Sequence, residues 1–486
     1  MEKFIRELQI GEIHARDVWQ FELKSEFFPP SETSVNSYSQ EFYIFIPNSL
    51  YINEEVYTSK QFYEDQTNFI RYKTPEQNLK QIVDPEFKAS PLSRLKTYLK
   101  QPHSKKNLKL IEDEVKLLGN IVRSAIRRRV KKIIDGKSDI IDFCNSIEKF
   151  QKEYIELKEH FHQEWGKKTS PPFIYTQEFM SKSIQYYLTG LLKRKEHTLS
   201  TEEREVLTDT IIKEIEWQKK SVRRNSHEKE TVLYRLGLLN KYVLDALLLQ
   251  TSKESLYNRF RNVIGSVSAG IAMLFFFVLF VWGGQVLIIN STPFILLTVI
   301  LYILKDRLKE GLRELSYRNF HKWFSDFQTD ILTPEGTKKI GHMTESFSFV
   351  NLKKLPHDIT YMRNREFHEV LDRVKRPEKV IYYKKKIQIQ LRKRKEERRY
   401  GLNIISRFNI SSFTKYASNS RHNLFTIDES TREVKKIKLP KVYHLNVILK
   451  NTTTDEKGRA QIEYKKFRIV LNKEGIVRVE HLPSKI

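Results

Sequence analysis

The sequence predicts an α+β membrane protein with N-terminal strands, a cytoplasmic helical bundle, a two-helix transmembrane hairpin and a C-terminal antiparallel β region. Three observations lead to this fold class. The stretch from Asn262 to Leu304 contains no Lys, Arg, Asp, Glu or His. Apolar residues recur at three- and four-residue spacing through residues 104–252, as they do in packed helices. From residue 422 onward, short alternating runs are separated by turn residues, which is typical of antiparallel strands.

Residues 1–103 are predicted to form an N-terminal α+β region. Strands are expected over Phe4–Ile13, Val18–Leu23 and Glu41–Ile46, because these runs carry β-branched and aromatic residues. A helix is expected to begin at Ser59 and to continue to about Lys73, where Thr74-Pro75 would end it.

Residues 104–252 are predicted to form a helical bundle. The helices are expected over residues 104–134, 138–165, 171–195, 200–223 and from about 226 into the first membrane span. Ser138 is expected to cap the second helix, and the segment Ser200 to Glu203 matches a capping box for the fourth.

Residues 253–304 are predicted to form a transmembrane helical hairpin. As one helix, the uncharged stretch from Asn262 to Leu304 would reach roughly 64 Å, which is close to two crossings of a ~30 Å hydrocarbon layer. Gly283-Gly284-Gln285 and the segment Asn290 to Pro293 supply residues for a turn between the two spans. The first residues of the chain lack a basic run followed by an apolar one, so we expect the hairpin to direct insertion.

Basic residues flank the hairpin at both ends and are absent from its turn. They are Arg259, Arg261, Lys305, Arg307 and Lys309. Because positive charge favours the cytoplasmic side, we predict that both termini are cytoplasmic and that these side chains contact lipid headgroups. A bacterial inner membrane is the simplest assumption.

Small residues in the first span are expected to let helices approach closely. They are Gly265, Ser266, Ala269, Gly270 and Ala272. Packing of the hairpin on itself is the first interpretation, and contact with a second copy is the alternative.

Residues 305–334 are predicted to continue as an amphipathic helix that leaves the membrane, and residues 335–421 to form a basic linker region. The linker carries a dense group of cations, which are Lys384, Lys385, Lys386, Arg392, Lys393, Arg394 and Lys395. Each cation near an anionic membrane is worth about 1 kcal/mol, so lipid headgroups are the first expected partner. A solvated surface is the second interpretation. Nucleic acid is the third, because tyrosines flank the group.

Residues 422–486 are predicted to form an antiparallel β meander. Strands are expected over Leu424–Asp428, Val434–Leu439, Tyr443–Lys450, Gln461–Leu471 and Ile476–Leu482. Turn-forming residues such as Lys473-Glu474-Gly475 separate them. The pattern leaves open whether these strands join those near the N-terminus.

One pattern in the meander has catalytic potential. Asp455 followed by Glu463 and Lys465 provides the carboxylates and the lysine with which a nuclease can hold Mg²⁺ and activate water. The same Glu-x-Lys triplet arises by chance in a chain rich in both residues, as at Glu22-Leu23-Lys24. These three residues are therefore the candidates for a catalytic role, and no cofactor or metal is expected.

Composition narrows the function. A formal net charge of +26 predicts an acidic partner, which is either a membrane surface or nucleic acid. The single cysteine, Cys144, excludes an internal disulfide framework and fits a reducing compartment. The sequence has no phosphate-binding glycine loop, dinucleotide fingerprint or Gly-x-Ser-x-Gly elbow.

These observations favour a non-enzymatic scaffold or binding protein anchored in a membrane. Its expected contacts are anionic lipid headgroups and either a protein partner or a second copy. One alternative is a membrane-tethered effector or nuclease that binds nucleic acid, and another is a pore or transport component. The fold class does not decide among them.

Overall fold

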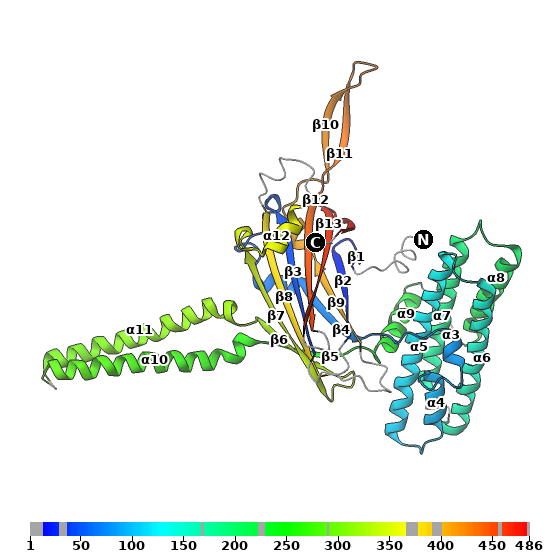
Figure 1. The fold of residues 1–486 in the computed structure, drawn as a ribbon, viewed down its shortest axis with the longest axis horizontal. Coiled ribbons are helices and arrows are strands. Elements are labelled where there is room, and N and C mark those ends of the chain that lie inside the picture. Colours follow the sequence, from blue (N-terminus) through cyan, green and yellow to red (C-terminus); the bar gives the residue numbers. More distant parts are fainter. Residues whose placement is uncertain are drawn as a thin grey trace.

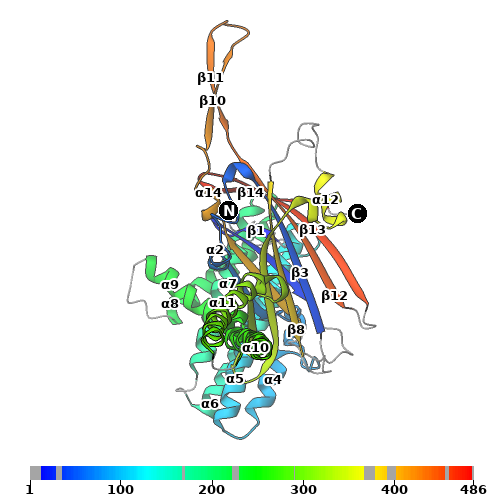
Figure 2. The same ribbon diagram turned by 90° about the vertical axis from the view of Figure 1, so that its left-hand side faces the viewer.

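The computed structural model describes residues 13–28, 36–166, 170–221, 229–288, 291–365, 378–390, 401–454 and 459–483. A β-sandwich lies in the middle, a helical bundle lies on one side of it, and a long helical hairpin projects from the other side (Figure 1). A two-stranded ribbon projects from one end of the sandwich (Figure 2). The chain is a mixed α+β protein with strands near both termini, as predicted.

Two antiparallel sheets form the sandwich. The larger has eight strands in the order β14-β13-β12-β3-β8-β7-β6-β5, and the smaller has four in the order β1-β2-β9-β4. The strands of the two sheets are β1 Ile13–Ala15, β2 Gln20–Phe27, β3 Asn36–Pro47, β4 Gln66–Tyr72, β5 Gln250–Ser255, β6 Phe327–Leu332, β7 Lys339–Val350, β8 Glu378–Ile389, β9 Leu402–Asn409, β12 Tyr443–Thr454, β13 Ala460–Asn472 and β14 Gly475–Leu482. Phe42 on β3 and Phe408 on β9 meet between the sheets with ring centroids 5.6 Å apart. The inward-facing rows of both sheets therefore share one core.

The N-terminal strands join the C-terminal ones, which answers the question that the sequence pattern left open. β3 lies between β12 and β8, with Ile44 opposite both Val447 and Ile381. β2 and β4 both pair with β9. The antiparallel meander predicted near the C-terminus is confirmed as β12, β13 and β14.

The region predicted to be a basic linker, residues 335–421, instead contributes β7, β8 and β9 to the sandwich. On β8, the buried residues Tyr383, Lys385 and Ile387 alternate with the more exposed Lys384 and Lys386. A lysine occupies an inward-facing position of this strand, so the run of charge concealed the two-residue period by which a strand is recognised.

The helix predicted from Ser59 to Lys73 ends early. α2 covers Ser59–Asp65, and β4 follows it directly. β4 pairs with β9 along its whole length, and Ile70 and Tyr72 are buried. Tertiary pairing therefore overrides the local helical pattern. Of the predicted strand Phe4–Ile13, only Ile13 lies within the described residues.

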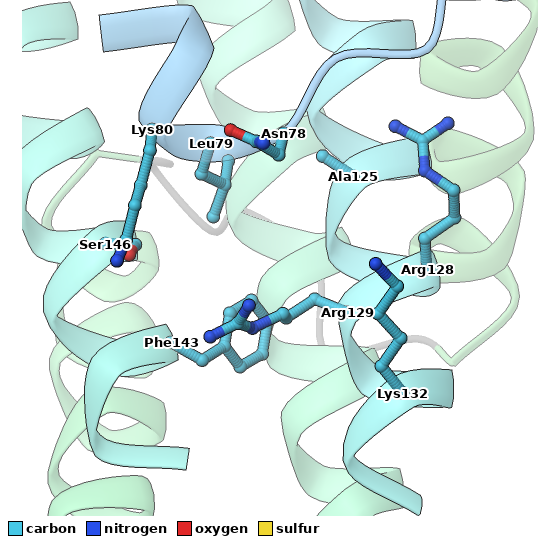
Figure 3. A pocket seen from close by; sticks show the side chains of 9 residues that line it. All are labelled: Asn78, Leu79, Lys80, Ala125, Arg128, Arg129, Lys132, Phe143 and Ser146. Carbon is cyan, nitrogen blue, oxygen red and sulfur yellow. The ribbon is translucent and has the colours of Figure 1, made fainter. Parts of the chain in front are cut away.

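The helices expected after residue 104 are present. The bundle contains α3 Leu79–Val83, α4 Pro91–Leu99, α5 Lys105–Ile134, α6 Ile140–Trp165, α7 Pro171–Arg194, α8 Thr201–Ser221 and α9 Lys229–Leu244. Ser200 and Glu203 form the expected capping box before α8. Asp139, and not Ser138, caps α6, because its carboxylate accepts the N–H of Ile141. A hollow lined by basic side chains lies between α3, α5 and α6 (Figure 3).

The last bundle helix was expected to continue into the first membrane span. It does not. α9 ends at Leu244, and β5 separates it from α10 (Leu256–Val286). α11 (Thr292–Trp323) follows, and β6 then takes the place of the helix predicted to continue to residue 334. Phe327 and Ile331 fitted a helical stripe because residues four apart share a face in a strand as well as in a helix.

Within the part of the chain that the structure describes, one helix is long and apolar enough to cross a membrane. This helix is α10, and 11% of its most apolar stretch is buried. The uncharged part of α11 runs from Thr292 to Leu304, which is about 20 Å and shorter than a ~30 Å hydrocarbon layer. The helical hairpin is present, but two membrane crossings are not confirmed.

Candidate functional site: the helical hairpin and its attachment

The hairpin of α10 and α11 exposes an apolar surface and stands away from the rest of the molecule (Figure 1). The exposed fraction is 69% for Leu274 and 65% for Val286 on α10, and 62% for Leu296 on α11. The two helices pack on each other near their tip, where the ring centroids of Phe280 and Phe294 lie 5.4 Å apart. An exposed apolar surface of this extent marks a site of contact with lipid or with another protein.

The register of the hairpin shows how far both helices are free of charge. A Cβ atom on Gly283 would lie 2.7 Å from Leu297 Cδ2, so these two residues face each other. Lys305 lies about two helical turns beyond Leu297 and is therefore level with about Phe275 on α10. From this level to the tip both helices are uncharged, over about 20 Å.

The cations predicted to contact lipid headgroups lie at two levels of the hairpin. Lys305, Arg307 and Lys309 belong to the middle of α11, whereas Arg259 and Arg261 lie in the first turns of α10, near the sandwich. Arg307 is 80% exposed at its side chain. α10 thus stays uncharged at the levels where α11 carries Lys305, Arg307 and Lys309. In a pair of equivalent membrane spans, both helices would become charged at the same level.

The small residues predicted to pack the hairpin on itself differ in their surroundings. A Cβ atom on Gly265 or Gly270 would meet no described atom within 4 Å. Ser268 and Ala272, one helical turn apart, are the buried residues in this part of α10. Ala272, a member of the predicted row, is thus buried, and packing of the other small residues within one hairpin stays a prediction. For contact with a second copy, the row of Gly265, Ser266, Ala269 and Gly270 stays a prediction.

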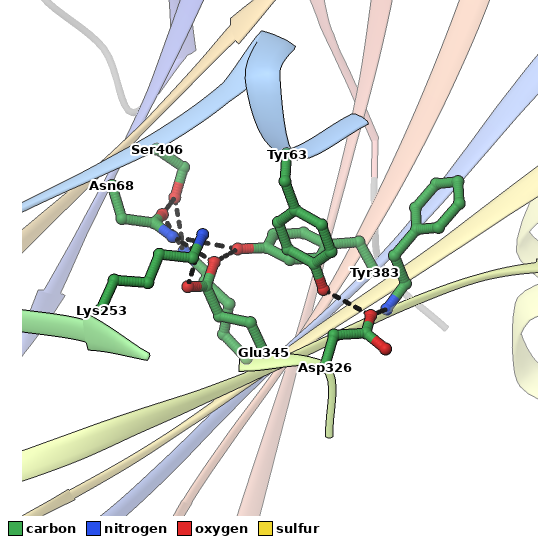
Figure 4. A network of polar contacts seen from close by, with 9 residues as sticks. Tyr63, Asn68, Lys253, Asp326, Glu345, Tyr383 and Ser406 are labelled. Carbon is green, nitrogen blue, oxygen red and sulfur yellow. Dashed lines mark hydrogen bonds and ion pairs between the residues drawn. The ribbon is translucent and has the colours of Figure 1, made fainter. Parts of the chain in front are cut away.

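Asp326 attaches the base of the hairpin to the sandwich, and Figure 4 shows the contact of its side chain with Tyr63. Its backbone carbonyl accepts the N–H of Leu256, the first residue of α10, at 3.1 Å, and its backbone N–H donates to the carbonyl of Glu345 at 2.7 Å. Its carboxylate accepts the hydroxyl of Tyr63 at 2.7 Å and the N–H of Phe347 at 2.8 Å. Asp326 is 4% exposed, so loss of a donor would leave a buried carboxylate poorly satisfied.

Glu345 is the centre of a second buried polar group beside the hairpin. Tyr383 and Asn68 donate to its Oε1 at 2.5 and 2.7 Å, and the ammonium group of Lys253 on β5 lies 3.4 Å from its Oε2. Burial raises the pKa of Tyr63 and of Tyr383 well above the ordinary value of a tyrosine. Both phenols therefore stay protonated and act as donors to the buried carboxylates.

Lys385, predicted to contact lipid or nucleic acid, belongs to the interior of the sandwich. Its side chain is fully buried, and it donates to Ser406 and, at 3.4 Å, to Asn68. Burial lowers the pKa of Lys385 to about 7. A side chain enclosed between two sheets has no access to a headgroup, so Lys385 is removed from the predicted contact surface.

The other cations of the predicted basic cluster divide into two groups. Lys384 forms an ion pair with Glu41 at 3.2 Å, and Lys386 is exposed. Arg392, Lys393, Arg394 and Lys395 lie outside the described residues. Their contact with lipid or nucleic acid stays a prediction.

Glu463 and Lys465 line a hollow of about 260 Å³ beside β2, β3, β12 and β13. Their charged groups lie 3.2 Å apart, and Asn451 donates to Glu463 at 3.4 Å. Asp455 lies outside the described residues, so its place beside Glu463 and Lys465 stays a prediction. Among the residues that are described, no group of three His, Cys, Asp or Glu could hold a metal ion.

Sequence reasoning missed that β10 (Arg421–Ile427) and β11 (Val434–Pro440) form a ribbon of their own. Phe425 and Val434 on this ribbon are 66% and 73% exposed. The ammonium group of Lys436 lies 5.9 Å from the centre of the Phe425 ring. The available signal was that basic and apolar residues occur on both faces of the pair, whereas a packed strand keeps its apolar residues on one face.

No protein-family model, curated protein or solved structure matches this chain. Its function is therefore inferred from the residues and the geometry described above. The exposed hairpin, with its buried attachment, is the feature that differs most from the surface of a water-soluble domain.

Proposed function

We propose that this chain is a scaffold or binding protein anchored to an anionic membrane by the tip of the α10–α11 hairpin, with the sandwich and the bundle in the cytoplasm. The exposed apolar surface of the hairpin carries the proposal. More than ten large apolar side chains between Leu274 and Leu304 are exposed. At about 1 kcal/mol each for partial exposure, their transfer to lipid would contribute on the order of 10 kcal/mol.

The distribution of charge favours partial insertion over two full crossings. The uncharged tip of about 20 Å covers roughly two thirds of a ~30 Å hydrocarbon layer. Lys305, Arg307 and Lys309 would then lie at the level of the headgroups, which long basic side chains readily reach. Each would add about 1 kcal/mol of attraction to an anionic surface.

The attachment through Asp326 supports a role in positioning. The hairpin is joined to the sandwich by hydrogen bonds from Leu256 and Tyr63 to a buried residue. Such an attachment would fix the direction of the sandwich and bundle with respect to the membrane. Holding binding surfaces at a set distance from a membrane is the function that this geometry supports best.

Vesicle flotation tests the proposal. The full chain is compared with a variant in which a short Gly-Ser turn replaces residues 258–323, which keeps Leu256 and Asp326. β5 and β6 pair as far as Ser255 and Phe327, so a short turn can join them. We expect the full chain to float with phosphatidylglycerol vesicles at high salt and the variant to stay in the dense fraction. Equal flotation of both proteins would contradict the proposal.

A second candidate function, nucleic-acid binding by a membrane-tethered protein, is favoured by the β10–β11 ribbon. A two-stranded ribbon fits the major groove of DNA, and this one carries exposed cations beside Phe425. The logarithm of the association constant for DNA falls with the logarithm of the salt concentration. Replacing Lys436 and Lys438 by Gln should make this slope less steep by about two, since each phosphate contact contributes about 0.9. Lys60→Gln, at a side chain 87% exposed on α2, is the control. Equal salt slopes for the ribbon variant and the unchanged protein would exclude the ribbon as the site of DNA contact. Substitution of Glu463 and Lys465, followed by a nuclease assay, tests whether the protein also cleaves nucleic acid.

A further inference from the structure

Four basic side chains line the hollow between α3, α5 and α6 (Figure 3). Lys80 comes from α3, and Arg128, Arg129 and Lys132 come from α5. The hollow has a volume of about 160 Å³, and Phe143 forms part of its wall. Because Lys80 is distant from the other three in the sequence, the fold brings this group together, and a local run of charge does not account for it.

A single carboxylate pairs with these four cations. Asp142 lies 2.7 Å from the ammonium group of Lys80 and 2.7 Å from the guanidinium of Arg129. Arg128 instead donates to the backbone carbonyl of Gln77 at 2.6 Å. Throughout the described residues, neither Arg128 nor Lys132 has a carboxylate at ion-pair distance. The side chains that line the hollow, counted with Asp142, therefore have an excess of three positive charges, and Glu76 attracts Arg128 from outside ion-pair distance.

The arrangement is electrostatically unfavourable without an anion. Arg128 and Lys132 are four residues apart on α5, and Arg129 and Lys132 are three apart, so like charges are neighbours on one face of the helix. The negative end of the helix dipole explains cations in the last turn of α5. It does not explain Lys80 on another helix, nor Arg128, whose burial lowers the pKa of its guanidinium.

We propose that this hollow binds a phosphoryl group, carried either by a soluble small molecule or by a lipid headgroup. A phosphate monoester carries nearly two negative charges at neutral pH and three strong acceptor oxygens, so it offsets three excess positive charges better than a carboxylate does. The guanidinium of Arg129 can bind phosphate oxygens in pairs, and Lys80 and Lys132 supply point charges. Phe143 provides an apolar wall for the body of the ligand. The proposal is independent of the membrane anchor.

Calorimetric titration of the full chain in a non-ionic detergent tests this proposal. The probes are inorganic phosphate, glycerol 3-phosphate and dihexanoyl phosphatidate below its micelle concentration, each at constant ionic strength. Lys132→Gln removes a cation that lines the hollow, and Lys131→Gln removes the neighbouring cation on α5, which is exposed as Lys132 is but does not line the hollow. The two variants have the same net charge and differ only in the position of the loss.

We expect saturable binding that Lys132→Gln weakens about tenfold, as for the loss of one hydrogen bond between charged groups, and that Lys131→Gln changes less than about twofold. Binding of phosphate or glycerol 3-phosphate would assign the phosphoryl group to a soluble ligand, and binding of phosphatidate alone would assign it to a lipid. Absence of saturable binding by every probe would overturn the proposal. An equal loss in the two variants would also overturn it, because it would indicate attraction by the net charge alone.

Discussion

Lysine placed at two positions of α10 would measure how deeply the hairpin enters the membrane. Leu274 and Val286 are 69% and 65% exposed, so neither substitution disturbs a packed interior. Leu274 lies near the level of Lys305, where we place the headgroups. Val286 lies at the tip, about 18 Å further along the helix and thus near the middle of a ~30 Å hydrocarbon layer.

The two depths predict opposite orders of effect. A lysine near the centre of the hydrocarbon costs about 2.5–3.5 kcal/mol, which corresponds to a loss of roughly 60- to 400-fold in partitioning into vesicles. Partial insertion assigns this loss to Val286→Lys and about a twofold change to Leu274→Lys. In a hairpin that crosses the membrane twice, Leu274 would lie at the centre and Val286 near the far headgroups, so the order would be reversed.

Flotation at a series of lipid concentrations gives the partition coefficient of each variant. Depth-dependent quenching of Trp282 by brominated lipids adds an independent readout, because Trp282 is 64% exposed near the tip. A larger loss for Leu274→Lys than for Val286→Lys would refute partial insertion and restore the two crossings predicted from the sequence. Equal small losses would refute membrane insertion of the tip altogether.

Three further predictions concern the attachment, the buried lysine and the tip. Tyr63→Phe removes a donor from buried Asp326 and should lower the free energy of unfolding by about 1–3 kcal/mol; an unchanged thermal transition would contradict the role of Asp326. Because the pKa of Lys385 is lowered from 10.5 to about 7, the folded protein binds fewer protons than the unfolded chain between these values. Its stability relative to Lys385→Met should therefore rise from about pH 7 to pH 9, and a difference that does not vary with pH would refute the burial of this lysine. Gly283→Ala should loosen the tip and increase its cleavage by protease in detergent, whereas Gly265→Ala should not, and equal cleavage would contradict the register.

Features determined by neighbouring residues could be predicted from the sequence. The capping box at Ser200 and Glu203 and the start of α5 after Ser104 depend on side chains that bond to the backbone within one turn. The hairpin was recognisable because a long uncharged stretch is rare in a chain in which 30% of the residues are charged. The proposed depth of insertion could not be predicted from the sequence. It depends on which residues of α10 and α11 face each other, and that register appears only in the folded hairpin.

Features that depend on distant pairing could not be predicted. β4 follows a helix directly and becomes a strand because β9, far away in the sequence, pairs with it. Lys385 was predicted to lie on the surface with its basic neighbours. It is buried because Ser406 on β9 and Asn68 on β4 accept its hydrogen bonds inside the sandwich. The basic hollow was missed for the same reason, since Lys80 joins the cations of α5 only in the folded bundle.

In the proposed function, the position of the hairpin between β5 and β6 separates membrane binding from the folding of the sandwich. β5 and β6 are antiparallel neighbours, and such strands can be joined by a turn of a few residues. The hairpin is therefore an insertion between two strands that a short turn could join. Among the described residues, the sandwich core contains no side chain from the apolar tip. Asp326 is the exception, because it belongs to the base of the hairpin and to the buried polar group at once. A force on the hairpin reaches the sandwich along the chain through β5 and β6, and the hydrogen bonds of Asp326 with Leu256 and Tyr63 brace this junction. This is the reason that Tyr63→Phe, far from the lipid, should loosen the orientation of the protein on the membrane as well as its fold.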